Sequence, residues 1–101
     1  MKTTHVLQIY RLTEEIDARG MPTQTRQLLL KTRCDLQQGH YELDRSDEGD
    51  RRRMATYAAY VPAGTSLQAI KVGDDVQATG PFDVSGRVAE VDFFSYVIYI
   101  R

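Results

Sequence analysis

Alternation of apolar and polar residues is clearest between Thr25 and Gln37. The even positions of this stretch are apolar or small, and the odd positions are mostly polar or charged. Because successive side chains of a strand point to opposite faces, the pattern predicts a long strand with one buried face. The predicted core face consists of Leu28, Leu30, Thr32, Cys34 and Leu36.

Five shorter segments also have the composition of strands. They are Thr4–Leu12, Arg53–Val61, Ile70–Ala78, Gly86–Asp92 and Ser95–Arg101. Turns are predicted over Glu14–Thr23, which contains Asp17, Gly20 and Pro22, and at Gly73–Asp74. No segment has a sustained helical period. The sequence therefore predicts an all-β fold, a small six-stranded antiparallel barrel or sandwich.

The region from Gln38 to Arg53 breaks the alternation. Nine of its last twelve residues are charged, five acidic and four basic. Such a segment does not bury enough apolar surface to fold on its own. We expect a long charged loop, or a short frayed helix, between the second and third strands.

Length and charge narrow the class of protein. With 101 residues the chain is one domain, residues 1–101. Its net charge of −1 weakens a role in wrapping duplex nucleic acid, which usually requires a basic excess. The single Cys34 excludes an internal disulfide. The apolar runs are too short for a membrane span or a secretion signal, so no membrane partner is expected.

Candidate chemistry is sparse. His5 and His40 have no ligand-type neighbours in sequence, and Cys34 falls on a predicted core face. The spacing of Asp44, Ser46, Glu48, Gly49 and Asp50 follows the start of a calcium loop. However, Ala55 stands where such a loop needs a bidentate Glu, and three arginines lie beside it. We expect no enzyme activity, no metal and no cofactor.

Two features leave alternatives open. Arg51, Arg52 and Arg53 either contact phosphates or an acidic partner, or form a solvated run offset by nearby carboxylates. The tyrosines are either a base-stacking platform or cross-strand packing pairs; they are Tyr57, Tyr60, Tyr96 and Tyr99. If the arginines contact phosphates and the tyrosines stack on bases, the chain is an OB-like barrel that binds single-stranded nucleic acid, which is the alternative function.

The order of short motifs resembles a known family. The motifs, in order, are HVLQIYRL, DARGMP, QLLLKTRCDLQ, ATYAAYVP, IKVGDDV and GRVAEV. In this order they resemble the head-closure, or head–tail joining, proteins of tailed bacteriophages and prophages, which act as connectors or adaptors. The resemblance spans nearly the whole chain.

This resemblance implies a non-enzymatic virion assembly protein. Its copies would be monomeric when isolated and form a ring on assembly, with portal or adaptor proteins and tail proteins as partners. The protein would be made in the host cytoplasm and help to close the channel around packaged DNA. A tail-terminator-like component is a further alternative. By position, the channel and partner contacts fall on Gln38, Gly39, Asp44, Asp47, Glu48, Asp50, Arg51, Arg52 and Arg53.

Overall fold

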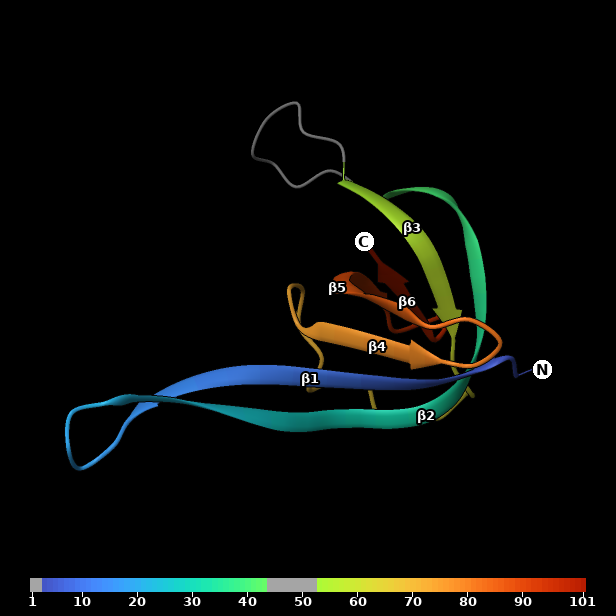
Figure 1. The fold of residues 1–101 in the computed structure, drawn as a ribbon. Coiled ribbons are helices and arrows are strands. Elements are labelled where there is room, and N and C mark those ends of the chain that lie inside the picture. Colours follow the sequence, from blue (N-terminus) through green and yellow to red (C-terminus); the bar gives the residue numbers. More distant parts are fainter. Residues whose placement is uncertain (1–2, 44–52) are drawn as a thin grey trace.

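The computed structural model of the chain describes residues 3–43 and 53–101, and within these ranges every regular element is a strand (Figure 1). Strand lengths range from four residues to the 22 of β2. The strands are β1 (His5–Ile16), β2 (Pro22–Leu43), β3 (Arg53–Tyr60), β4 (Asp75–Thr79), β5 (Val84–Asp92) and β6 (Val97–Ile100).

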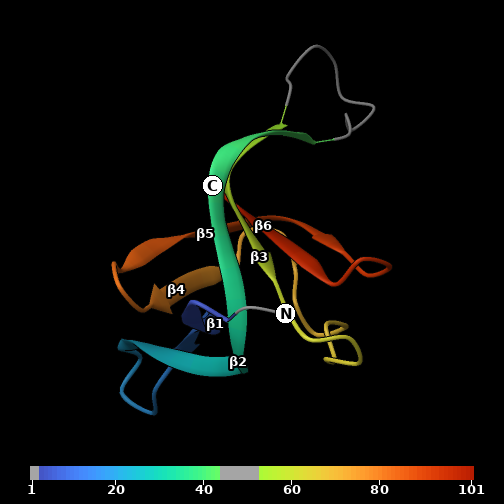
Figure 2. The same cartoon turned by 90° about the vertical axis from the view of Figure 1, so that its right-hand side faces the viewer.

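The six strands close into a barrel in the order β1-β2-β3-β6-β5-β4. Every neighbouring pair is antiparallel, and β1 completes the ring by pairing with β2 on one edge and β4 on the other. Figure 2 shows how β2 curves, so that its first part pairs with β1 and its last part with β3. The expectation of a six-stranded antiparallel fold is confirmed, in its barrel form.

Aliphatic side chains fill the barrel. The most deeply buried core side chains come from four strands and the segment after β3: Leu7, Ile9, Cys34, Val61, Val88, Ile98 and Ile100. A smaller cluster joins the far end of β2 and β3 to β5 and β6. It contains Leu43, Ala55 and Ala89, with the rings of Tyr41 and Tyr99 packed against them. The second cluster thus fixes the β2–β3 end onto the barrel.

Strands β1 and β2 continue beyond the barrel. Strand β4 pairs with β1 only from Val6 to Tyr10, whereas β2 pairs with β1 as far as Ile16. Residues 11–16 and 22–27 therefore form a two-stranded extension, here called the distal ribbon, which projects from the body in Figure 1.

The predicted turn over Glu14–Thr23 is too long. Only residues 17–21 form the turn, and the strands take the rest. The Asp17 carboxylate accepts hydrogen bonds from the backbone N–H groups of Arg19 and Met21, both at 2.9 Å, and Gly20 has a φ of 78°. This compact geometry frees the flanking residues to pair.

The predicted core face of the second strand is correct only in part. Cys34 and Leu36 are buried, but Leu28 is exposed. Ile9 pairs with Leu30 and the next residue, Tyr10, pairs with Leu28, so Leu29 is an extra residue in β2. This β-bulge reverses the alternation and turns Leu28 to the outside.

The predicted loop between the second and third strands is also too long. Gln38 and Gly39 belong to β2, which continues to Leu43, and Arg53 is the first residue of β3. Apolar burial at Leu43 explains the extension, because that side chain packs into the second cluster. The other predicted contact residues lie outside the described ranges: Asp44, Asp47, Glu48, Asp50, Arg51 and Arg52.

An ion pair joins the ribbon to the barrel where β1 leaves it. Arg11 Nε and one Nη donate to the two carboxylate oxygens of Asp74, each at 2.9 Å. The same Nη donates to the Ala69 carbonyl at 2.8 Å, and the Lys71 N–H donates to Asp74 at 2.8 Å. Asp74 is only 6% exposed, so these donors replace the water that its carboxylate has lost.

The environment of Asp74 lowers its pKa overall. Burial by itself would raise the pKa, but the hydrogen bonds from Arg11 and the Lys71 backbone, together with their charges, outweigh burial. A lowered folded-state pKa stabilises the fold above the unfolded-state pKa. That stability is lost as the pH falls through the folded-state pKa.

We predict that Asp74→Asn lowers the free energy of unfolding by about 2 kcal/mol at pH 7, because the Arg11 guanidinium loses the negative charge and one of the two acceptor oxygens of its partner. The adjacent Asp75→Asn is the matched control, since Asp75 only reaches the exposed Arg87 at 4.0 Å and such pairs contribute less than about 1 kcal/mol. Urea titrations at pH values from 7 to below about 4 measure the free energy of unfolding of both variants and of the wild type. The Asp74 effect should shrink on acidification. Equal effects of the two variants at pH 7 would contradict this role.

Burial also governs Cys34. Burial, and secondly the charge of Asp35, raises the pKa of this thiol to about 11. The prediction of a buried, unreactive cysteine leads to a test with an aromatic disulfide reagent at pH 8. Cys34 should react only after denaturation, whereas a thiol introduced by Lys31→Cys at an exposed position should react at once. Equal rates in the folded protein would show that Cys34 is accessible.

Candidate interaction surfaces

The predicted contact residues within the described ranges do not form a site. Gln38 is exposed on β2, and Gly39 lies at a second bulge, where Gln38 pairs with Tyr57 and Tyr41 with Ala55. A Cβ on Gly39 would approach the ring of Tyr41 to 3.2 Å, so the glycine allows this ring to pack. Its role in the structure is therefore local.

One continuous surface covers the outside of β1 and β2, here called the outer ribbon face. Residues paired across antiparallel strands share a face, and the pairing assigns alternate residues of both strands to this one. They are Val6, Gln8, Tyr10, Leu12, Glu14 and Ile16 of β1, and Pro22, Gln24, Arg26, Leu28, Lys31 and Arg33 of β2.

The outer ribbon face combines cations with apolar side chains. Arg26, Lys31 and Arg33 are all exposed, and Glu14 is its single carboxylate. Leu12 is 50% exposed, Ile16 75% and Leu28 48%. The Arg26 guanidinium lies 4.1 Å from the centre of the Tyr10 ring, which orients it over the face. Apolar groups left in water beside cations are typical of a surface that another molecule covers.

The same strands have unpaired backbone edges. Among the described residues, nothing pairs with β1 beyond Tyr10 except β2, and nothing pairs with β2 before Asp35 except β1. A two-stranded ribbon without a third strand or a helix against it is only marginally stable in water. Covering the distal ribbon would therefore order it further.

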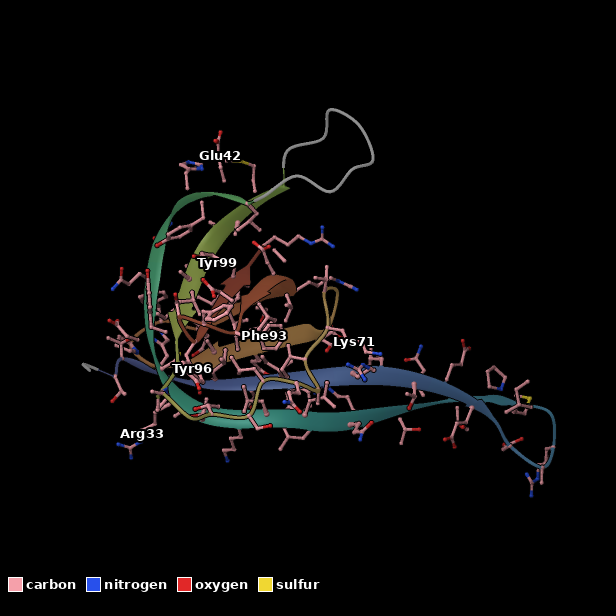
Figure 3. The ribbon with its side chains drawn as sticks, turned by 180° about the vertical axis from the view of Figure 1, so that it is seen from behind. Arg33, Glu42, Lys71, Phe93, Tyr96 and Tyr99 are labelled. Carbon is pink, nitrogen blue, oxygen red and sulfur yellow. The ribbon has the colours of Figure 1, made fainter. Side chains whose placement is uncertain are left out.

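A second surface lies at the turn between β5 and β6. A recess of about 440 Å³ is lined there by Glu42, Glu90, Val91, Asp92, Phe93, Phe94 and Tyr99, and is here called the acidic recess. Figure 3 labels Glu42, Phe93 and Tyr99, which reach it from β2, the β5–β6 turn and β6.

The turn presents its aromatic residues to solvent. The Asp92 carboxylate accepts hydrogen bonds from the N–H groups of Phe94 and Ser95 at 3.0 and 3.1 Å. Tyr96 adopts a φ of 54°, which completes the reversal of the chain. As a result Phe94 is 98% exposed and Phe93 54%. An aromatic side chain this exposed on an ordered turn is available to a partner.

The charged side chains among the described residues that line the recess are all carboxylates: Glu42, Glu90 and Asp92. The pKa of Tyr99 is raised by burial and then by its neighbours Tyr60, Asp92, Glu90 and Tyr41. Glu90 and Asp92 both line the recess, so their carboxylates border the same small volume. The recess therefore favours the binding of positively charged groups.

The tyrosines divide between two packing roles. Tyr57 and Tyr96 pack against the main core, and Tyr99 packs against Tyr41 with ring centres 5.5 Å apart. Tyr60 is half-buried and pairs with Val97 across β3 and β6. These contacts favour the packing alternative over a continuous stacking platform.

Among the residues that the structure describes, neither histidine belongs to a group of side chains that could bind a metal. His5 is buried, with Nε2 donating to the Phe82 carbonyl at 2.9 Å and Nδ1 bonded to the Thr4 hydroxyl at 2.7 Å. His40 is exposed on β2. Within residues 3–43 and 53–101 no group of three or more His, Cys, Asp or Glu side chains is placed to bind a metal. Nor does a helix long and apolar enough to cross a membrane occur in these ranges.

Sequence reasoning missed both surfaces. The outer ribbon face depends on the bulge at Leu29, which has no clear sequence signature. The recess had a signal in the consecutive Phe93 and Phe94, because two large aromatic residues are unusual in a turn between strands.

Comparison of the chain with family models, curated protein sequences and solved structures returns no match. Any function must therefore be argued from these two surfaces and the resemblance of the motifs.

Proposed function

We propose that the chain is a non-enzymatic assembly protein of a phage or prophage virion. It joins the DNA-filled head, through the portal or adaptor ring, to the tail and helps to close the DNA channel. The motif order supports the choice of virion protein, and the surfaces support a role in assembly.

The observation that carries the proposal is the distal ribbon. The barrel closes without it, since β4 pairs with β1 only as far as Tyr10. The ribbon nevertheless places Leu12, Ile16 and Met21 in solvent, with Met21 61% exposed at its tip. A projection that the body does not need, and that exposes apolar side chains, is suited to contacts with neighbouring proteins.

Among the described residues the titratable groups with perturbed pKa values are paired or packed. Arg11 and Asp74 bind each other, Cys34 lies in the core, and Tyr41 packs on Tyr99. The closed barrel then acts as a rigid base from which the ribbon and the β5–β6 turn project.

The test is complementation of a phage from which this gene is deleted. Removing the facing residues Thr13, Glu14, Gln24 and Thr25 shortens the ribbon by two pairs and keeps the alternation of its faces. We predict that the shortened variant folds, yet yields heads without tails or heads that lose their DNA in electron micrographs. The control is Asp83→Asn, a substitution at an exposed position on the β4–β5 connection, which should restore infectious particles.

The outcomes separate the proposal from its alternatives. Normal particles from the shortened variant would contradict the assembly role of the ribbon. Filled heads accompanied by tails of irregular length would identify a tail-terminator-like component instead. The nucleic-acid alternative predicts salt-sensitive binding of a labelled single-stranded oligonucleotide by the purified chain.

A further inference from the structure

We propose that the outer ribbon face of one copy binds the acidic recess of a second copy of this chain. The inference rests on the proposed function, because it assigns the contact between subunits of the assembled ring. The contact is heterologous, meaning that two different surfaces meet and each copy keeps one of each free.

The positions of the two surfaces in the barrel support this arrangement. In the strand order β1-β2-β3-β6-β5-β4, β6 is three places from β1 and β5 is three places from β2. The β5 and β6 residues of the acidic recess therefore lie across the six-stranded barrel from the outer ribbon face, and Glu42 reaches the recess from the far end of β2. Contacts between opposite sides repeat head to tail, and they give a closed ring when the rotation between copies permits.

The charges of the two surfaces are complementary. The outer ribbon face carries Arg26, Lys31 and Arg33 with Glu14 as its one carboxylate. The recess is lined by acidic residues, and Glu90 and Asp92 both raise the pKa of Tyr99. Opposite potentials guide such surfaces together and set their orientation.

The apolar groups are complementary as well. Leu12, Ile16 and Leu28 are at least 48% exposed on the outer ribbon face, and Phe93 and Phe94 border the recess. Burial of these side chains against each other removes apolar surface from water in both copies. The contact thus has an apolar centre within a rim of opposite charges, which is the usual composition of protein interfaces.

A second copy explains these features better than nucleic acid. Phosphates would match the three cations but not Leu12, Ile16 and Leu28 between and beyond them. They would also leave the acidic recess without a partner, since like charges repel. The recess of a neighbouring copy satisfies both the cations and the apolar groups.

The test is charge reversal in the purified chain, followed by sedimentation velocity at low ionic strength, where screening is weak. Wild type should associate weakly between about 10 µM and 1 mM. Lys31→Glu and Glu90→Lys should each lower the association constant roughly tenfold. The matched controls, Arg101→Glu and Asp83→Lys, make the same charge changes at exposed positions outside both surfaces and should behave as wild type.

Mixing the two surface variants gives the decisive result. The Glu at position 31 of one copy then faces the Lys at position 90 of another, so the mixture should associate more strongly than either variant alone. No rescue, or no association of wild type at 1 mM, would overturn this interface. The interface would also be overturned if Lys31→Glu lost oligonucleotide binding while its self-association stayed unchanged. Each of these results leaves the head-joining role to be judged by complementation.

Discussion

The Arg11–Asp74 ion pair is the contact on which the arrangement of the molecule depends. Tyr10 and Asp75 form the last pair between β1 and β4. Arg11 comes directly after Tyr10, and Asp74 directly before Asp75, so the ion pair lies next to this last pair. The barrel therefore ends, and the distal ribbon begins, at a buried carboxylate bound by a guanidinium and a backbone N–H. This contact fastens the segment before β4 to β1 at the base of the ribbon. It therefore holds the base of the ribbon in one position on the barrel.

Local pattern was sufficient to predict most of the fold but not its junctions. Alternation correctly placed Cys34 and Leu36 in the core, and the turn at Gly73 has the positive φ expected of glycine there. The partner of Asp74 was not predictable, because Arg11 is 63 residues away and the two meet only when β1 and β4 close the barrel. Leu28 was misplaced because a single extra residue, Leu29, reverses the alternation without changing local composition.

The candidate site was harder to predict than the fold for a physical reason. Charge density pointed to the region from Gln38 to Arg53, and of the contact residues predicted there only Gln38, Gly39 and Arg53 fall in the described ranges. Interaction surfaces depend instead on which apolar residues remain exposed after the core is formed. That set, including Ile16, Leu28 and Phe94, follows from strand lengths, the bulge and turn geometry rather than from composition.

In the proposed function, the outer ribbon face and the acidic recess are the surfaces through which one subunit contacts another. The central claim is that the distal ribbon is exposed in the free chain and covered in the assembly. Amide hydrogen exchange of residues 11–27, compared between the isolated chain and the chain bound to DNA-filled heads, tests it most directly. The account predicts rapid exchange in the isolated chain and strong protection on the heads. Equally rapid exchange in both states, with protection appearing elsewhere, would contradict it.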